Sequence, residues 1–211
     1  MQPYPDREAA GRALAGPLAR FRDRPDALVL GLPRGGVPVA AALAGSLRLD
    51  WDVLLVRKLT VPGLPELAMG AVALLDGRLI VYQNPLVRKR HPVPSADFEQ
   101  ELKRQERVLR ERDADYRRYR TPRPVVGRLA LIVDDGLATG STMQAAVRAL
   151  PGPARIVVVA PIGSPQACRE LAATGVAVSC PWQPGNFSSV SQGYLDFAQL
   201  DDRTVHRILA R

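Results

Sequence analysis

Short apolar segments alternate with helical segments along most of this chain, and that alternation restricts the possible folds more than any other feature. Three apolar runs, at 27–32, 52–56 and 129–133, have the length of buried strands. Helical patterns follow the first run at 37–47 and the third at 141–150. Strand–helix–strand order favours parallel pairing through right-handed crossovers. The sequence therefore predicts an α/β fold of three layers, with helices flanking a mostly parallel sheet.

The remaining segments extend this pattern or interrupt it. Residues 6–22 have helical spacing, and Pro17 is expected to kink or split that helix. The other expected elements are a loop at 60–67, strands at 68–75 and 79–82 around an Asp76-Gly77 turn, a strand at 156–159, a helix at 165–173 and a strand at 176–179. The hairpin is the only antiparallel unit that the pattern predicts.

Two segments depart from the alternation. Residues 84–120 predict a helical insertion, whose main helix at 95–119 is strongly charged and begins at a capping residue, Ser95. Its thin apolar stripe is typical of a surface helix, which could serve as a lid or as a dimer arm. Residues 180–211 carry aromatic side chains and are expected to form a hood over the edge of the sheet. We expect residues 1–211 to form a single domain.

Composition limits the partners and the location. The net charge is +8, which suits anionic partners such as nucleic acid or phosphorylated small molecules without choosing among them. The two cysteines, Cys168 and Cys180, have no zinc-ligand spacing. We find neither a signal-peptide pattern nor an apolar stretch of membrane-spanning length, and we expect a cytoplasmic protein with no membrane partner.

The most specific segment joins the third strand to its helix. Residues 131–142 read LIVDDGLATGST: an apolar strand end, two carboxylates, a glycine-rich loop and hydroxyl groups that open a helix. Gly136 and Gly140 permit a tight turn in which successive N–H groups face one anion, and the helix N-terminus adds further donors. Asp134 and Asp135 can accept hydrogen bonds from the vicinal hydroxyls of a ribose. The segment predicts a sugar-phosphate site, and it lacks the lysine of a P-loop.

Cationic residues follow the first two strands. Arg34, Gly35 and Gly36 lie between the first strand and its helix, where two glycines let the backbone approach a bulky anion. Arg57 and Lys58 follow the second strand, so these loops are all expected at the carboxyl edge of the sheet, where ligands of open α/β sheets bind. A turn with a solvated arginine, or a basic strand end in water, would explain either segment alone.

Residues 131–142 closely resemble the binding motif for phosphoribosyl pyrophosphate (PRPP) in type I phosphoribosyltransferases. The resemblance covers residues 1–180 and is closest to a bacterial branch with the pattern LPRGGVPVA, VRKL, PELAMGAV and VDDGLATGST. The long helical insertion and the lack of a clear base-binding signature set this chain apart from the well-known branches. In the family, the peptide near the arginine of the first loop often adopts a cis form.

The resemblance implies a role for each matching residue. Asp134 and Asp135 would bind the ribose hydroxyls and, directly or through water, Mg²⁺. Arg34, Arg57 and Lys58 would stabilise the departing pyrophosphate, so these five residues are the implied catalytic set. The 5-phosphate would lie on the loop that consists of Gly136, Leu137, Ala138, Thr139, Gly140, Ser141 and Thr142, and the pyrophosphate on Arg34, Gly35, Gly36, Arg57 and Lys58.

The implied reaction is transfer of the phosphoribosyl group of PRPP to a nitrogen acceptor, a nucleobase being the usual one, as in nucleotide salvage. The hood aromatics Trp182, Phe187 and Tyr194 could stack on the acceptor ring or could simply pack the cap. A homodimer is the family habit. The main alternative is a regulator that senses PRPP and binds nucleic acid, which the net charge permits, although no nucleic-acid-binding motif is visible.

Overall fold

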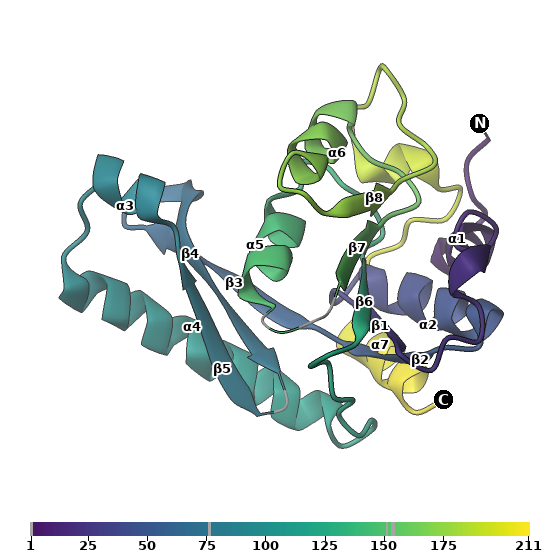
Figure 1. The fold of residues 1–211 in the computed structure, drawn as a ribbon, viewed down its shortest axis with the longest axis horizontal. Coiled ribbons are helices and arrows are strands. Elements are labelled where there is room, and N and C mark those ends of the chain that lie inside the picture. The colour runs from purple at the N-terminus through teal and green to yellow at the C-terminus, as the bar shows by residue number, and fades with distance from the viewer. Residues whose placement is uncertain (1, 76, 151, 153–154) are drawn as a thin grey trace.

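A five-stranded parallel sheet forms the centre of the protein (Figure 1). The computed structural model describes residues 2–75, 77–150, 152 and 155–211. The strands are β1 Ala27–Gly31, β2 Asp50–Val53, β6 Leu129–Val133, β7 Arg155–Val159 and β8 Ala177–Ser179. They lie in the order β2-β1-β6-β7-β8, and each neighbouring pair is parallel. The predicted mostly parallel sheet is confirmed.

Helices cover both faces of this sheet and complete the three predicted layers (Figure 1). They are α1 Arg7–Leu14 and α2 Gly36–Leu47 on one face, and α5 Ser141–Ala149 and α6 Pro165–Ala172 on the other. Val29 and Leu131 belong to the core on the α2 side, whereas Leu30 and Ile132 belong to the core on the α5 side. Because successive strand residues point to opposite faces, a continuous apolar run is needed to fill both layers.

A second, antiparallel sheet extends away from the first (Figure 1). It consists of β3 Leu55–Val61, β4 Leu64–Leu75 and β5 Arg78–Gln83, followed by the helices α3 Pro85–Arg90 and α4 Ser95–Tyr116. The predicted hairpin is confirmed in the pairing of β4 with β5, although Asp76 of its turn lies outside the described residues. We refer to β3, β4, β5, α3 and α4 together as the arm.

Two predictions in this region are wrong. The run at 52–56 is not one strand, because β2 ends at Val53 and β3 begins at Leu55 in the other sheet. The predicted loop at 60–67 is mostly strand, and only Pro62 and Gly63 separate β3 from β4. The reason in both cases is the β4 segment, which pairs antiparallel with residues 55–61 and draws them away from the parallel sheet.

The predictions for the helices are partly confirmed and partly wrong. The predicted helix at 6–22 is split, as expected at Pro17, into α1 and a short 3-10 helix at Ala19–Phe21. Ser95 is the first residue of α4 and not its cap, because Pro94 occupies the capping position and makes no side-chain hydrogen bond. The apolar stripe of α4 is buried: Phe98 and Leu109 join a core that includes residues of the antiparallel sheet.

The N-terminal segment pairs with residues 193–195 of the predicted hood. The backbone N–H of Tyr4 donates to the Gly193 carbonyl at 2.8 Å, and the N–H of Leu195 donates to the Tyr4 carbonyl at 2.8 Å. The last helix, α7 Asp202–Leu209, packs instead with α2 and with the core next to α4. Within the described residues, no helix combines the length and the hydropathy that a bilayer crossing requires.

Candidate functional site

The loop between β6 and α5 presents unpaired N–H groups. β6 ends at Val133, and α5 begins at Ser141 directly after Gly140, whose φ of 70° places it in the left-handed region. The capping residue Gly140 has no side chain to bond the first turn of α5, so the amides that follow Ser141 in that turn remain available to an anion. The hydroxyl of Thr139 accepts from the Ser141 N–H at 3.3 Å and donates to the Ser141 hydroxyl at 3.1 Å. This end of the loop can therefore hold a phosphate.

The same loop is fixed in place by the loop that follows β7. The Leu137 N–H donates to the Ile162 carbonyl at 2.9 Å, and the Ser164 N–H donates to the Leu137 carbonyl at 2.8 Å. The Ser164 hydroxyl donates to the Ala138 carbonyl at 2.8 Å. These bonds use the carbonyl groups of Leu137 and Ala138 and one loop N–H, that of Leu137, and they hold the loop backbone in place. A preformed anion site avoids the entropic cost of ordering a loop at binding.

The paired carboxylates lie at the start of the loop in a crowded setting. Asp134 Oδ1 accepts from the Asp135 N–H at 2.9 Å, and the Tyr194 hydroxyl donates to the Asp135 carbonyl at 2.6 Å. Burial, together with the charge of Asp135, raises the pKa of Asp134 well above its usual range. Burial also raises the pKa of Tyr194, which therefore remains a donor. A cation or the hydroxyls of a diol would compensate the buried charge at this pair.

Arg7 of α1 is a partner of Asp135 that the sequence analysis missed. Its Nε lies 2.8 Å from Asp135 Oδ2, and its Nη1 donates to the Ala198 carbonyl at 2.9 Å. The guanidinium also lies over the Phe197 ring, 3.9 Å from the ring centroid. Arg7 precedes Asp135 by 128 residues, and no local spacing could have connected them. The N-terminal helix is therefore part of the site.

The glycine loop after β1 packs directly against these carboxylates. A Cβ atom at Gly35 would lie less than 3.0 Å from Asp135 Oδ2, and one at Gly36 would lie equally close to the Val133 carbonyl oxygen. Only glycine allows this approach, because contacts under 3.0 Å force the neighbouring atoms to move. The Pro33–Arg34 peptide is cis, in agreement with what the family resemblance implied. The two predicted ligand loops thus touch one another.

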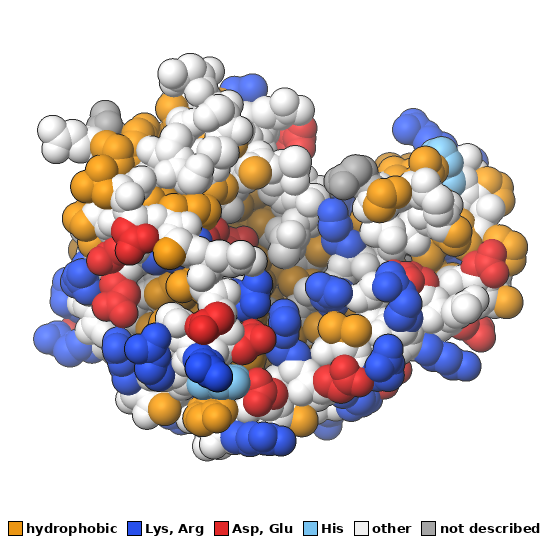
Figure 2. All heavy atoms as spheres, turned by 180° about the vertical axis from the view of Figure 1, so that it is seen from behind, with side chains coloured by type: hydrophobic (Ala, Val, Ile, Leu, Met, Phe, Trp, Pro, Cys, Tyr) orange, Lys and Arg blue, Asp and Glu red, His pale blue; other side chains and the backbone are white. Residues whose placement is uncertain are grey.

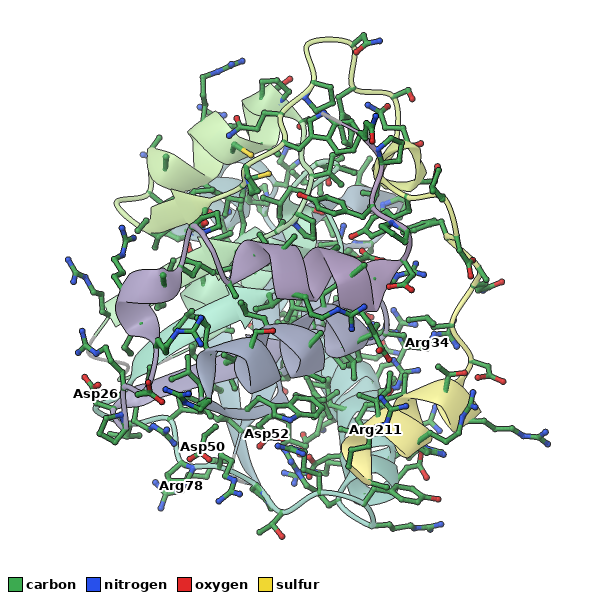
Figure 3. The ribbon with its side chains drawn as sticks, turned by 90° about the vertical axis from the view of Figure 1, so that its right-hand side faces the viewer. Asp26, Arg34, Asp50, Asp52, Arg78 and Arg211 are labelled. Atoms are coloured by element: carbon green, nitrogen blue, oxygen red, sulfur yellow. The ribbon has the colours of Figure 1, made fainter. Side chains whose placement is uncertain are left out.

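Arg34 lies at the edge of this junction. Its side chain is 35% exposed, and its Nη1 lies 3.9 Å from the Asp202 carboxylate at the start of α7. Figure 3 shows Arg34 near this helix. Such a long, exposed pair contributes little and leaves the guanidinium able to bind another anion. Arg34 and Gly35 share a pocket of about 300 Å³ with Arg7, Asp135 and Phe197.

Arg57 and Lys58 lie at the site, but on a different element from the one that the sequence predicted. They were expected after the end of a parallel strand, but both lie inside the antiparallel strand β3. Lys58 Nζ nevertheless donates to the Ser141 hydroxyl at 3.3 Å, which links β3 to the phosphate loop. Arg57 donates through Nε to Gln105 of α4 at 2.9 Å. Both cations line a second cavity, which also includes Thr142.

The hood aromatics pack mainly against one another and against the N-terminus. Tyr4 and Tyr194 are buried with Ile162, and Trp182 and Phe187 pack against this cluster. The ring of Tyr4 lies 6.2 Å from that of Trp182 in an edge-to-face arrangement. Of the two alternatives, this packing favours a structural role for the three predicted aromatics over stacking on a ligand.

A resident metal centre of the all-protein type is not formed by the described residues. No group of three or more His, Cys, Asp or Glu side chains comes together there. Mg²⁺ differs from zinc in this respect, because it is commonly held by one or two carboxylates and the oxygens of a phosphorylated substrate. The Asp134–Asp135 pair, in which both residues are half-buried, fits that mode of binding.

Known proteins with similar sequences and structures share one description. A family model described as a phosphoribosyl transferase domain matches residues 5–180. Proteins from two strains of Mycobacterium tuberculosis, each with a provisional phosphoribosyl transferase name, are 41% identical to the chain across 100% of its length. The match covers 47% of each, so the chain spans about half the length of the curated relatives it matches.

A solved structure extends this similarity to the whole fold. The crystal structure of TT1426 from Thermus thermophilus is 41% identical in sequence and matches with a TM-score of 0.88. The match covers 100% of this chain and 98% of that one. It therefore includes the arm and the C-terminal helix as well as the central sheet.

Proposed function

Because the chain belongs to the phosphoribosyltransferase family, we propose that it transfers the phosphoribosyl group of PRPP to a nitrogen acceptor and releases pyrophosphate. The observation that carries this proposal is the loop of residues 134–142. It begins with two carboxylates and ends at the backbone N–H groups of the first turn of α5. A diol and a phosphate monoester, at the spacing of a ribose 5-phosphate, match those two kinds of group.

The proposed roles follow from the contacts. Asp134 and Asp135 accept hydrogen bonds from the ribose hydroxyls, and the amides and hydroxyls of residues 138–142 bind the 5-phosphate. Arg34, Arg57 and Lys58, with the amides of the glycine loop, bind the pyrophosphate group. The attraction between these cations and the leaving group is strongest in the transition state, when negative charge develops on the pyrophosphate. It therefore lowers the activation free energy.

The reaction we propose is a substitution at C1 of the ribose. The lone pair of an acceptor nitrogen forms the new bond to C1 while the C1–O bond breaks and its electron pair leaves with pyrophosphate. Positive charge builds up on C1 and the ring oxygen, so holding the two reactants in line is a large part of the catalysis. Bound Mg²⁺, held by Asp134 and Asp135 with substrate oxygens, would neutralise charge on the pyrophosphate.

We place the acceptor in the pocket of about 300 Å³ that Arg34, Gly35 and Asp135 share with Phe197. This pocket adjoins the carboxylates that would hold the ribose, and its volume is at the lower end of the range for ligand pockets. Besides Phe197 and Leu200, the pocket is lined by Arg7, Arg34, Asp135 and Gln199, whose polar groups could hydrogen-bond the edge of a planar nitrogen base such as a nucleobase. The product would then be a nucleoside monophosphate.

Pyrophosphate release tests the proposal. The protein is incubated with PRPP and Mg²⁺, with and without each member of a panel of purines, pyrimidines and other nitrogen bases. We expect release that depends on one acceptor class and falls by about tenfold or more in Arg57→Met, which removes one charge-assisted contact to the leaving group. Absence of release with every acceptor, combined with a nucleic-acid affinity that falls steeply with salt, would contradict the proposal and favour the PRPP-sensing regulator.

A further inference from the structure

The cavity between β3 and α4 has a strongly cationic lining. It has a volume of about 380 Å³ and contains Arg57 and Lys58 from β3, with Arg104 and Arg112 from α4. No acidic side chain is among the described residues that line it. From behind, the molecule shows a hollow between the parallel sheet and the arm, with Lys and Arg side chains around it (Figure 2). Arg104 is paired with Glu101 at 2.7 Å, but Arg57, Lys58 and Arg112 have no carboxylate within salt-bridge distance among the described residues. Cations gathered in this way repel each other unless an anion lies between them.

The wall that α4 provides is held in a fixed position. The face of α4 that packs on the antiparallel sheet is buried, with Phe98 and Leu109 at most 4% exposed. Beyond the last turn, Arg117 Nη1 lies 2.6 Å from Asp52 of β2, a carboxylate that is only 2% exposed. The helix is thus attached to both sheets. This packing argues against a mobile lid and indicates that α4 forms a fixed wall of the cavity.

Gln105 connects α4 to the cations of the site. It is one of two polar or charged side chains among the described buried residues, at 5% exposure. Its Oε1 accepts from Arg57 Nε at 2.9 Å, and its Nε2 donates to Glu101 Oε1 at 2.8 Å. Glu101 in turn accepts two hydrogen bonds from Arg104, at 2.7 and 2.9 Å. This chain of bonds orients Arg57 through Nε and leaves its two terminal nitrogens for a ligand.

The other end of the cavity borders the phosphate loop. Thr142 and Pro33 line it together with Lys58, whose ammonium group contacts Ser141. A ligand in the cavity therefore lies next to a ribose 5-phosphate on residues 134–142, at the side where the glycine loop begins. A doubly phosphorylated leaving group matches both the position and the charge.

We propose that α4 forms the far wall of the pyrophosphate site, with Arg104 and Arg112 as direct ligands and Gln105 as the positioning residue for Arg57. This inference rests on the proposed function, and it assigns pyrophosphate binding to the inserted helix.

Calorimetric titration of the full chain with inorganic pyrophosphate and Mg²⁺ tests this assignment. We expect Arg112→Met to weaken pyrophosphate binding about tenfold or more, the loss typical of one charge-assisted contact. Arg107→Met is the matched control, because Arg107 lies on the same helix with a side chain that is 71% exposed, and it should bind normally. Affinity for ribose 5-phosphate should be unchanged in both variants.

The role of Gln105 needs a second readout, since a structural role alone could weaken binding. Gln105→Leu should lower pyrophosphate affinity several-fold in the wild-type background and have no further effect in Arg57→Met, as expected for a residue that acts through Arg57. Wild-type pyrophosphate affinity in Arg112→Met, or an unchanged effect of Gln105→Leu without Arg57, would overturn the assignment and leave the proposed function intact. No pyrophosphate binding by the wild-type chain would overturn both.

Discussion

Replacement of Arg7 by Met should destabilise the fold although Arg7 lies far from the central core. The substitution keeps most of the aliphatic side chain and removes the guanidinium, which makes two hydrogen bonds, to Asp135 at 2.8 Å and to the Ala198 carbonyl at 2.9 Å. The side chains of Arg7 and Asp135 are only 10% and 15% exposed, so this pair is closer to a buried ion pair than to a surface one.

The magnitude follows from those contacts. A hydrogen bond to a charged group contributes about 1.5–3 kcal/mol, and breaking a fully buried pair costs about 3–5 kcal/mol. Because water still reaches part of Asp135, we expect Arg7→Met to lower the free energy of unfolding by about 2–4 kcal/mol. For a chain of this size that corresponds to a fall in Tm of roughly 5–15 °C.

Urea denaturation of wild type, Arg7→Met, Asp135→Asn and the double variant measures the interaction. We expect a coupling energy of about 1–3 kcal/mol between the two residues. Arg12→Met is the control: its guanidinium is 3.7 Å from Glu8 and its side chain is 56% exposed, so a change below about 0.5 kcal/mol is expected. A loss under about 1 kcal/mol in Arg7→Met, or zero coupling, would refute the reasoning.

Three further outcomes follow from single side chains. Asp135→Asn should lose most of its PRPP affinity by calorimetry while circular dichroism shows a retained fold; unchanged affinity would count against its ribose role. Gly35→Ala should also weaken PRPP binding, since its Cβ would lie under 3.0 Å from the Asp135 carboxylate, whereas Gly45→Ala meets no atom within 4 Å and should bind normally. Tyr116→Phe should match or exceed wild-type stability in urea, because the Tyr116 hydroxyl is buried without a hydrogen-bond partner among the described residues; a loss above about 1 kcal/mol would contradict this.

Local patterns in the sequence predicted most of the central sheet and the loop that carries the proposal. The apolar run that ends at Val133, the two carboxylates and the glycines that follow lie close together in the chain, so their arrangement depends on short-range geometry. The glycine loop after β1 was found for the same reason. Its direct contact with Asp135 depends on the parallel pairing of β1 with β6. The alternation of elements predicted a parallel sheet but not which strands are neighbours in it.

The rest of the site depends on contacts that no local pattern encodes. Residues 52–56 are uniformly apolar after Asp52, and the division between two sheets appears only when β4 pairs with β3. Asp52 is held by Arg117 across 65 positions, and Arg57 by Gln105 across 48. In a single sequence such pairs are indistinguishable from solvated charges. The one available signal for Gln105 was its position between Leu102 and Leu109, at the helical spacing of the apolar stripe.

A crystal structure of the protein soaked with PRPP and Mg²⁺ tests the central claim most directly. Our account predicts that the 5-phosphate lies against the amides of residues 138–142, that the ribose hydroxyls lie on Asp134 and Asp135, and that the pyrophosphate faces Arg57 and Lys58. PRPP bound elsewhere, or a site left empty with Arg7 still covering Asp135, would contradict it.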